Sequence, residues 1–533
     1  MDLKWLKLER SLLVLLLIMS FFLFFYKLGA PSYFETDEII YSQVAREIVS
    51  TGDWVTLHLF TKNWFIHPPM YMWLVASSSR VLGDNEFNTR IWVAIFSVGL
   101  IFVTYLLGRR MFRNGVGLLA AFILATSLQY ILQARIAIFD IPLVFFIILS
   151  LLFFLNWMED RRPRDLYLFF LSMGLAMLMK GPVGVLLPML VIIPFLAVTG
   201  ELRALFNLRL IPGIIITYLA GGTWYTIEAV IHGQRFVDAV FGFYMIGRYL
   251  TSIEQHYAPW YFYVPVILVG FIPWISFLPY SIYYQWVKKG DGNNLFTIMW
   301  LAIVFIFFTL AGTKLPGYII SFYPLAAISV AKLFADDWSG EDEGIPALVP
   351  NSYKTLAMYS VILVLIGVMF KVFEAPDRLD HIFSDLNIMF LILGVGGLAA
   401  ALSSFRSRER RMPVAVLIIT MLIFALYTAD RTMVTLDEFK PMKAISQKVN
   451  AEYMGGQLIV GYKVLNRGSF LHYLDKPVVW IEDPNDLKGW LKTSKKLYLI
   501  TNEKDFMNIG KEYSRSLFLL YKAGDMVLLI NKK

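Results

Sequence analysis

Long apolar runs separated by short polar connections constrain the fold of this chain more than any other feature. There are about thirteen of them, and most approach the roughly 20 residues that a helix needs to cross a bilayer. A charged content of 17% agrees, because soluble proteins carry about 25%. We expect a multi-span α-helical membrane protein with spans near residues 11–28, 88–107, 115–132, 140–157, 165–180, 183–199, 210–229, 261–285, 295–311, 317–335, 354–371, 386–404 and 412–428.

The distribution of basic residues predicts the orientation of these spans. The first run follows a basic N-terminus and has no convincing cleavage site, so we expect an uncleaved span with a cytoplasmic N-terminus. Five of the six connections on the cytoplasmic side are then basic, and only residues 335–344 are acidic. An odd number of spans puts the tail in the periplasm. The net charge of +8 is thereby explained by cytoplasmic loops rather than by nucleic-acid binding.

The chain is expected to divide into a membrane domain, residues 1–430, and a soluble periplasmic α/β domain, residues 431–533. In the second part, runs such as Q-L-I-V-G-Y, P-V-V-W-I, K-L-Y-L-I-T and D-M-V-L-L-I predict strands, while 441–453 and 486–491 predict helices. The first periplasmic loop, 29–88, contains an amphipathic helix that begins at Asp37 and Glu38. We expect this helix to lie along the membrane surface.

Cations recur at the expected outer ends of the spans, where charge is costly and therefore informative. They are surrounded by glycine, proline and aromatic residues, and comprise Arg135, Lys180, Arg248 and Lys314, with His256 in the same outer loop as Arg248. A lone lysine at a helix end usually extends to the interface. Several such junctions on one side favour a site for an anion. For Asp37 and Glu38 alone, stabilisation of a helix dipole explains the acidic pair equally well.

This set of charges suits transfer from a lipid-linked phosphate. Arg and Lys neutralise a phosphate in low dielectric and stabilise it as a leaving group, and one carboxylate can take a proton from an acceptor hydroxyl. Glycoside hydrolysis usually needs two carboxylates that flank the bond. A flippase for lipid-linked sugars would share the basic cavity, but it would more typically show repeats and mid-span charges. An assembly protein would leave the outer cations unexplained.

The motifs that carry these residues resemble those of the polyprenyl-phosphate-dependent GT-C glycosyltransferases. The resemblance runs from about residue 37 to residue 324, and its motifs read F-E-T-D-E-I-I-Y, G-D-W, F-I-H-P-P-M-Y-M-W, A-R-I-A-I-F-D, K-G-P-V-G and T-K-L-P-G-Y-I-I-S-F-Y-P. The chain is most similar to the bacterial lipid A aminoarabinose transferases and more loosely to the dolichyl-phosphate-mannose protein mannosyltransferases. The resemblance implies a GT-C fold with thirteen spans, surface helices in the first loop and a C-terminal periplasmic α/β domain.

The resemblance also implies roles for individual residues. Asp37, Glu38 and Asp140 match catalytic acidic positions, and Lys314, Tyr318 and Arg248 match residues near the donor phosphate. The remaining expected substrate-binding residues are Lys180, Arg135, His67, Tyr71, Arg90 and His256. Arg90 fits an interfacial anchor equally well. Where aminoarabinose transferases typically have F-E-K-P, this chain has F-I-H-P-P, with His67 in place of the glutamate.

Together these features predict an inverting glycosyltransferase of the bacterial inner membrane. It would move a sugar from a polyprenyl (undecaprenyl) phosphate to lipid A, lipopolysaccharide or another glycan at the periplasmic face; the alternatives are a protein O-mannosyltransferase-like enzyme and a flippase. The expected partners are the lipid-linked donor, a lipid or glycan acceptor and membrane lipids, with no nucleic acid, and the protein is expected to be a monomer. Six scattered histidines and no cysteine predict no metal site. A requirement for a divalent cation is left as an alternative.

Overall fold

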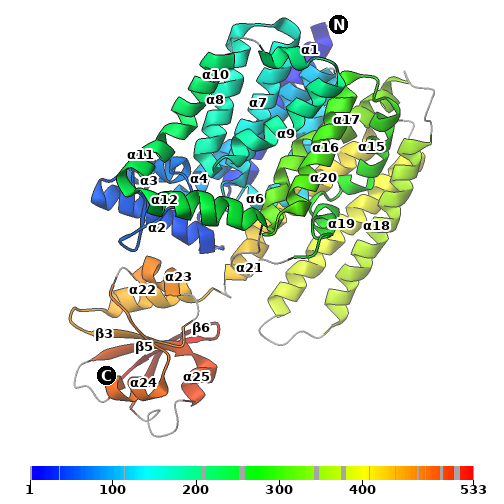
Figure 1. Ribbon diagram of the computed structural model, residues 1–533. Helices are drawn as coiled ribbons and strands as arrows, with labels where there is room; N and C mark the ends of the chain where they lie inside the picture. The colour runs from blue at the N-terminus through cyan, green and yellow to red at the C-terminus, as the bar shows by residue number, and fades with distance from the viewer. Residues whose placement is uncertain are drawn as a thin grey trace.

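The protein is a helical bundle followed by a small sheet domain, seen here in a computed structural model (Figure 1). Figure 1 shows the C-terminal sheet beneath the end of the bundle that carries α2 and α12, while the N-terminus lies at the opposite end. The structure describes residues 3–34, 36–112, 114–206, 210–250, 258–340, 347–373, 380–406, 409–437, 440–464, 467–474, 476–491, 496–508 and 516–531.

Helices account for nearly all of the bundle. In chain order they are α1 (Leu3–Phe25), α2 (Thr36–Thr51), α3 (Met70–Leu82), α4 (Glu86–Met111), α5 (Asn114–Ala125), α6 (Leu128–Gln133), α7 (Asp140–Asp160), α8 (Pro163–Lys180), α9 (Val183–Val198), η1 (Leu202–Phe206), α10 (Leu210–Thr217), η2 (Tyr218–Gly222), α11 (Thr223–His232), α12 (Gln234–Val237), η3 (Asp238–Gly247), α13 (Arg248–Leu250), α14 (Tyr263–Gly270), η4 (Trp274–Ser276), α15 (Leu278–Val287), α16 (Gly292–Leu310), η5 (Pro316–Phe322), α17 (Tyr323–Ser339), α18 (Leu348–Val372), α19 (Asp380–Arg406), α20 (Met412–Tyr427), η6 (Thr428–Thr432) and α21 (Met433–Asp437).

Each of the thirteen expected apolar runs lies at one helix or at two or three consecutive helical elements, but fewer of them are full-length spans. Among the described residues, nine helices are long and apolar enough to cross a membrane, and the pair α14 and α15, bent by 115°, would make ten. Two more apolar helices, Gly115–Ala125 and α9, are shorter than a typical span. The eighteen residues of α8 include three charged side chains, Arg164, Asp165 and Lys180. The run 115–132 is divided, because α5 ends at Ala125 and α6 begins at Leu128.

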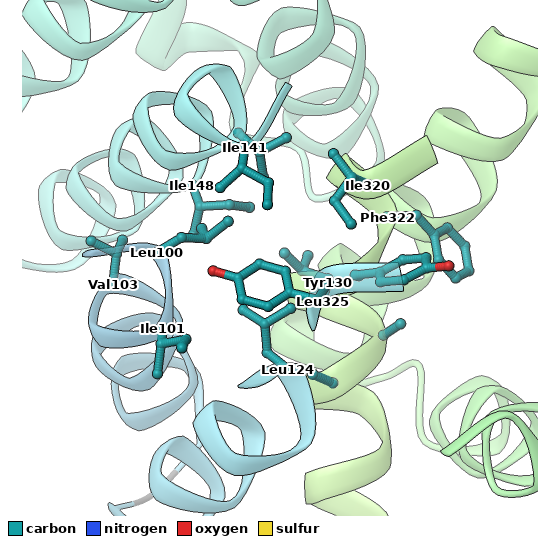
Figure 2. Close-up of a cluster of buried hydrophobic side chains, with 14 of the residues drawn as sticks. Leu100, Ile101, Val103, Leu124, Tyr130, Ile141, Ile148, Ile320, Phe322 and Leu325 are labelled. Atoms are coloured by element: carbon teal, nitrogen blue, oxygen red, sulfur yellow. The ribbon is translucent and has the colours of Figure 1, made fainter. Parts of the chain in front are cut away.

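The core of the bundle lies directly beneath the residues expected at the site. Figure 2 shows Ile141, next to Asp140, and Ile320, two residues after Tyr318, packed around Tyr130 with side chains from α4, α5 and α17. The hydroxyl of Tyr130 donates to the carbonyl of Ser97 at 2.6 Å, so this buried polar group is satisfied. The N-terminal ends of α7 and η5 therefore rest on closely packed side chains.

The first loop folds against the bundle instead of lying only on lipid. Its elements are α2, a hairpin of β1 (His58–Leu59) and β2 (Lys62–Asn63), and α3. Val44 and Ile48, from the apolar stripe expected at the membrane surface, are buried in the core, while Ile40 is half-buried. The apolar face of α2 packs on α3 and α4 because these helices offer it an apolar partner within the protein.

A buried ion pair fixes the start of α2. Arg90 on α4 donates from Nε to Glu38 Oε1 at 2.8 Å and from Nη2 to Oε2 at 3.0 Å, and neither side chain has exposed surface. The guanidinium also donates to the carbonyls of Leu28, Pro31 and Ser32. Such a network uses every donor of the arginine, as a charge buried in a protein requires.

The C-terminal part is a five-stranded sheet in the order β4-β3-β5-β7-β6. Strands β4 (Val479–Ile481), β3 (Leu458–Tyr462) and β5 (Leu497–Asn502) are parallel, while β7 (Met526–Ile530) and β6 (Phe518–Ala523) are antiparallel to their neighbours. Helices α22 (Met442–Glu452) and α23 (Arg467–Leu474) cover one face, and α24 (Pro484–Leu491) and α25 (Glu503–Asn508) cover the other. The four expected strands lie at β3, β4, β5 and β7, and the two expected helices lie at α22 and α24.

We predict that Glu38→Gln destabilises the fold strongly, because it leaves the Arg90 guanidinium buried without a counter-charge. Removing one member of a buried pair typically costs about 3–5 kcal/mol. Thermal unfolding of the purified protein in detergent, followed by tryptophan fluorescence, measures the loss. The double variant Glu38→Gln/Arg90→Met removes the stranded charge and should be more stable than Glu38→Gln. Equal stability of Glu38→Gln and wild type would contradict the assignment.

Candidate active site

A cavity of about 460 Å³ opens between the first loop and the helices of the bundle. Most of its wall is apolar and comes from α7, α9, η3 and the end of α16, with Leu143, Val144, Ile147, Val183, Leu186, Leu187, Val240, Phe307 and Phe308. Polar side chains also contribute to the lining: His67, Asp140, Lys180, Thr313, Tyr318 and Ser321. The cavity therefore combines an apolar surface with a small group of charged and hydroxyl side chains, as ligand pockets commonly do.

Asp140 and Lys180 form the charged centre of this group. Lys180 Nζ donates to Asp140 Oδ1, and the ammonium lies 5.3 Å from the ring centre of Phe139 and 4.9 Å from that of Tyr318. Asp140 is the first residue of α7 and Lys180 the last of α8, where an acidic and a basic residue respectively complement the helix dipoles. Two sequence motifs, A-R-I-A-I-F-D and K-G-P-V-G, thus meet at one point.

The glycine of the K-L-P-G-Y motif brings η5 against this pair. A Cβ atom on Gly317 would lie 3.0 Å from Asp140 Oδ2 and 3.1 Å from Gln133 Nε2, so a larger residue would fit only if these side chains shifted. Gln129 Nε2 donates to the carbonyl of Pro316 at 2.6 Å, and the Tyr263 hydroxyl donates to that of Leu315 at 3.2 Å. These bonds hold the backbone that presents Tyr318 to Lys180.

His67 lies among aromatic rings at the cavity wall. Its ring centre is 4.8 Å from that of Phe139, 5.8 Å from Trp64 and 6.1 Å from Tyr41. Tyr71 packs behind these rings, fully buried, and its hydroxyl donates to the carbonyl of Thr89 at 2.6 Å. His67 therefore lines the cavity, whereas Tyr71 supports the aromatic wall.

The two adjacent acidic residues of the first loop have different surroundings. Asp37 is exposed and lies one turn before Tyr41 on α2, and it is not among the residues that line the cavity. Glu38 points into the protein and also accepts from the backbone N–H of Ala137 at 2.7 Å. Burial would raise the pKa of Glu38, but the Arg90 charge and the donated hydrogen bonds outweigh it, and the pKa lies below its ordinary value. Glu38 thus stays ionised and holds the loop that leads to Asp140.

Of the other expected cations, Arg135 and Lys314 are engaged with backbone carbonyls and are not among the lining residues of the cavity. Arg135 donates to the carbonyls of Leu23, Phe24 and Tyr26, where α1 ends. Lys314 is buried and donates to the carbonyl of Ala311 at 2.6 Å, and its neighbours Ala311 and Thr313 line the cavity. His256 and the side chain of Arg248 lie outside the described residues.

Two residues that line the cavity, and one that packs behind its wall, were not singled out from the sequence. Tyr244 and Tyr249 lie on η3 and α13 at the cavity, in the same F-Y-M-I-G-R-Y-L run that contains Arg248. Phe139 immediately precedes Asp140 and provides the ring between His67 and Lys180. The signal in the sequence that could have identified these residues was their position as aromatic residues beside a candidate charged residue. In the described part of the chain, no group of three or more His, Cys, Asp or Glu residues could hold a metal ion.

Comparisons with known proteins agree with this geometry. Residues 66–225, which include His67, Asp140 and Lys180, match the family model described as dolichyl-phosphate-mannose-protein mannosyltransferase. Over 324 residues, 59% of this chain, the sequence is 31% identical to undecaprenyl phosphate-alpha-4-amino-4-deoxy-L-arabinose arabinosyl transferase 1 of Pseudomonas fluorescens. The undecaprenyl phosphate-alpha-4-amino-4-deoxy-L-arabinose arabinosyl transferase of Pseudomonas aeruginosa is 28% identical over 78% of this chain and 75% of its own length. The chain spans 63%, 58% and 56% of three curated relatives from Aquifex aeolicus and Pseudomonas fluorescens.

The whole chain can be compared at the level of the fold. The crystal structure of ArnT from Cupriavidus metallidurans bound to undecaprenyl phosphate superposes with a TM-score of 0.81, covering 100% of this chain and 98% of that one at 19% identity. The expected GT-C fold is therefore confirmed. The superposition covers the chain from end to end, and the sequence resembles glycosyltransferases named for polyprenyl-phosphate-linked sugars, the undecaprenyl phosphate-aminoarabinose transferases among them.

Proposed function

We propose that this protein is an inverting glycosyltransferase that moves a sugar from a polyprenyl phosphate to a lipid A-type or other glycan acceptor. The observation that carries the proposal is the cavity that joins a long apolar wall to the Asp140–Lys180 pair. An isoprenoid chain matches the apolar wall and a phosphate matches the ammonium, so a lipid-linked phosphate fits both. The names of the relatives, which include undecaprenyl phosphate and an arabinosyl transferase, support the same class of donor.

In the proposed reaction, Lys180 contacts the donor phosphate and Asp140 keeps the ammonium directed toward Tyr318. An acceptor oxygen attacks C1 of the sugar from the side opposite the phosphate, and a new C1–O bond forms as the C1–O bond to phosphate breaks. The electron pair leaves with the phosphate, whose charge Lys180 stabilises. Asp37 takes the proton when the acceptor is a hydroxyl, and it orients the acceptor when that acceptor is already an anionic phosphate.

The proposed setting is the inner membrane of a bacterium, with the N-terminus in the cytoplasm and the cavity and residues 431–533 in the periplasm. The basic connections on one side of the bundle support this orientation. We further propose a membrane domain of residues 1–430, in which the first periplasmic loop is 29–88, and a monomeric protein. From the sequence alone, we also assign Arg248 and His256 to the proposed donor site.

We expect Asp37→Asn to remain folded and to lose sugar transfer, because the proposed proton acceptor is removed from an exposed position. Mass spectrometry after incubation in detergent with polyprenyl-phosphate sugars and candidate acceptors measures the glycosylated product and free polyprenyl phosphate. Asp84→Asn is the control, since it removes a carboxylate of the same loop that pairs with Arg46. Transfer by Asp37→Asn at the wild-type rate would remove Asp37 from the mechanism. If no sample reacts and a lipid-linked sugar changes leaflets in proteoliposomes, the protein is a flippase.

Replacement of Lys180 should weaken binding of the lipid-linked donor more than replacement of Lys314. A charge-assisted bond to phosphate contributes about 1.5–3 kcal/mol, so Lys180→Met should raise the Kd for the donor roughly 10- to 100-fold. Lys314→Met removes a bond to the Ala311 carbonyl and should change the Kd less. Binding of a polyprenyl phosphate measured by microscale thermophoresis gives both values, and Lys180→Arg, which keeps the charge, is the control. An equal loss in both variants would give Lys314 direct contact with the phosphate.

A further inference from the structure

Residues 32–34, which precede Asp37, are hydrogen-bonded to the chain that leads into the C-terminal domain. Lys440 Nζ donates to the carbonyl oxygens of Tyr33, at 3.1 Å, and of Phe34, and lies 4.4 Å from the centre of the Phe34 ring. Asp437 accepts from the backbone N–H of Ser32 at 2.9 Å and from its hydroxyl. Three consecutive residues, Ser32 to Phe34, are thus bonded to residues from the far end of the sequence.

The C-terminal domain adds further contacts around the same segment. The Tyr473 ring stacks on Tyr33 with 5.9 Å between centres, and its hydroxyl donates to Glu86 at 3.0 Å. Arg46 on α2 donates to the carbonyl of His472 at 3.0 Å. Burial lowers the pKa of His472 to about 3, with a further contribution from the charge of Arg46, so this imidazole is neutral in the contact. The α23 end of the domain therefore docks on α2 and on the start of α4.

The opposite side of the segment is bonded to the bundle. The backbone N–H of Phe34 donates to Glu38 Oε2 at 2.6 Å, and the Tyr33 hydroxyl contacts Ser42 and Thr89 at 2.9 and 2.8 Å. Glu38 is in turn held by Arg90. Residues 32–34 consequently lie between two groups of contacts, one from the bundle and one from the C-terminal domain.

We propose that the C-terminal domain positions the catalytic carboxylate, with Lys440 as the positioning residue that acts through Tyr33 and Phe34 on Asp37. The two carbonyls that Lys440 binds lie three and four residues before Asp37, so they set the direction in which the chain enters α2. Without the ammonium, both carbonyls turn toward water and the first turn of α2 shifts. A displacement of about 1 Å at a reacting group can cost roughly 100-fold in rate.

This inference rests on the proposed transfer reaction, and its test compares kcat with donor affinity. Lys440→Met should lower kcat roughly 10- to 100-fold, while the KM for the donor and its Kd stay within about twofold, because the cavity and Lys180 are untouched. Lys440→Arg, which can donate to the same carbonyls, should recover most of kcat. Lys448→Met is the matched control: its ammonium pairs with Glu452 within α22, and its replacement should leave the rate unchanged. The melting temperature of each variant separates positioning from unfolding.

A reversible cross-link gives a second measurement that does not rely on the loss of a charge. The chain has no cysteine, so Ser32→Cys with Asp437→Cys introduces the only two thiols, at side chains already in contact. In the Lys440→Met background, oxidation of this pair should restore kcat several-fold, and reduction should abolish the gain. Unchanged kcat in Lys440→Met, or a gain absent on oxidation, would overturn the positioning role while wild-type transfer stands. Absence of transfer by the wild type would instead overturn the proposed function, and this inference with it.

Discussion

The buried ion pair between Glu38 and Arg90 is the interaction on which the rest of the site depends. Its carboxylate accepts from Arg90, from the N–H of Phe34 and from the N–H of Ala137, so it joins the start of α2, α4 and the loop before α7. A pair with no exposed surface adds little net stability to the fold, because the cost of desolvating both charges opposes their Coulomb attraction. The pair instead fixes the relative positions of three segments far apart in the sequence, because all three bind the Glu38 carboxylate.

The architecture could be predicted from the sequence because it follows from local patterns. Apolar runs marked the bundle helices, and alternating residues marked β3, β4, β5 and β7. The patterns did not reveal that α2 packs inside the protein, because an amphipathic stripe looks the same whether its partner is lipid or α3 and α4. Nor did they reveal that the run 115–132 breaks between α5 and α6, since both pieces are apolar.

The roles of the charged residues were harder to separate, because a buried charge needs the same residue types whether it binds substrate or the protein itself. Neighbours on a helix point about 100° apart, so Asp37 is exposed while Glu38 is buried against Arg90. Arg135 and Lys180 both follow apolar spans, yet one binds the carbonyls at the end of α1 and the other lies in the cavity. Only the fold, through contacts between residues 40 to 112 positions apart in the sequence, decides between these uses.

The same contacts explain why the charged group needs segments so distant in sequence. From Lys440 a continuous series of bonds runs through the backbone of Phe34 to Glu38, on to Ala137, and by the chain to Asp140 and Lys180. A carboxylate that must act within about 3 Å of a reacting oxygen tolerates little freedom in its helix. A loop at a membrane surface has few neighbours to restrain it. The bundle restrains this loop from one side, and the C-terminal domain restrains it from the other, so the soluble domain has a structural role at the site in the bundle.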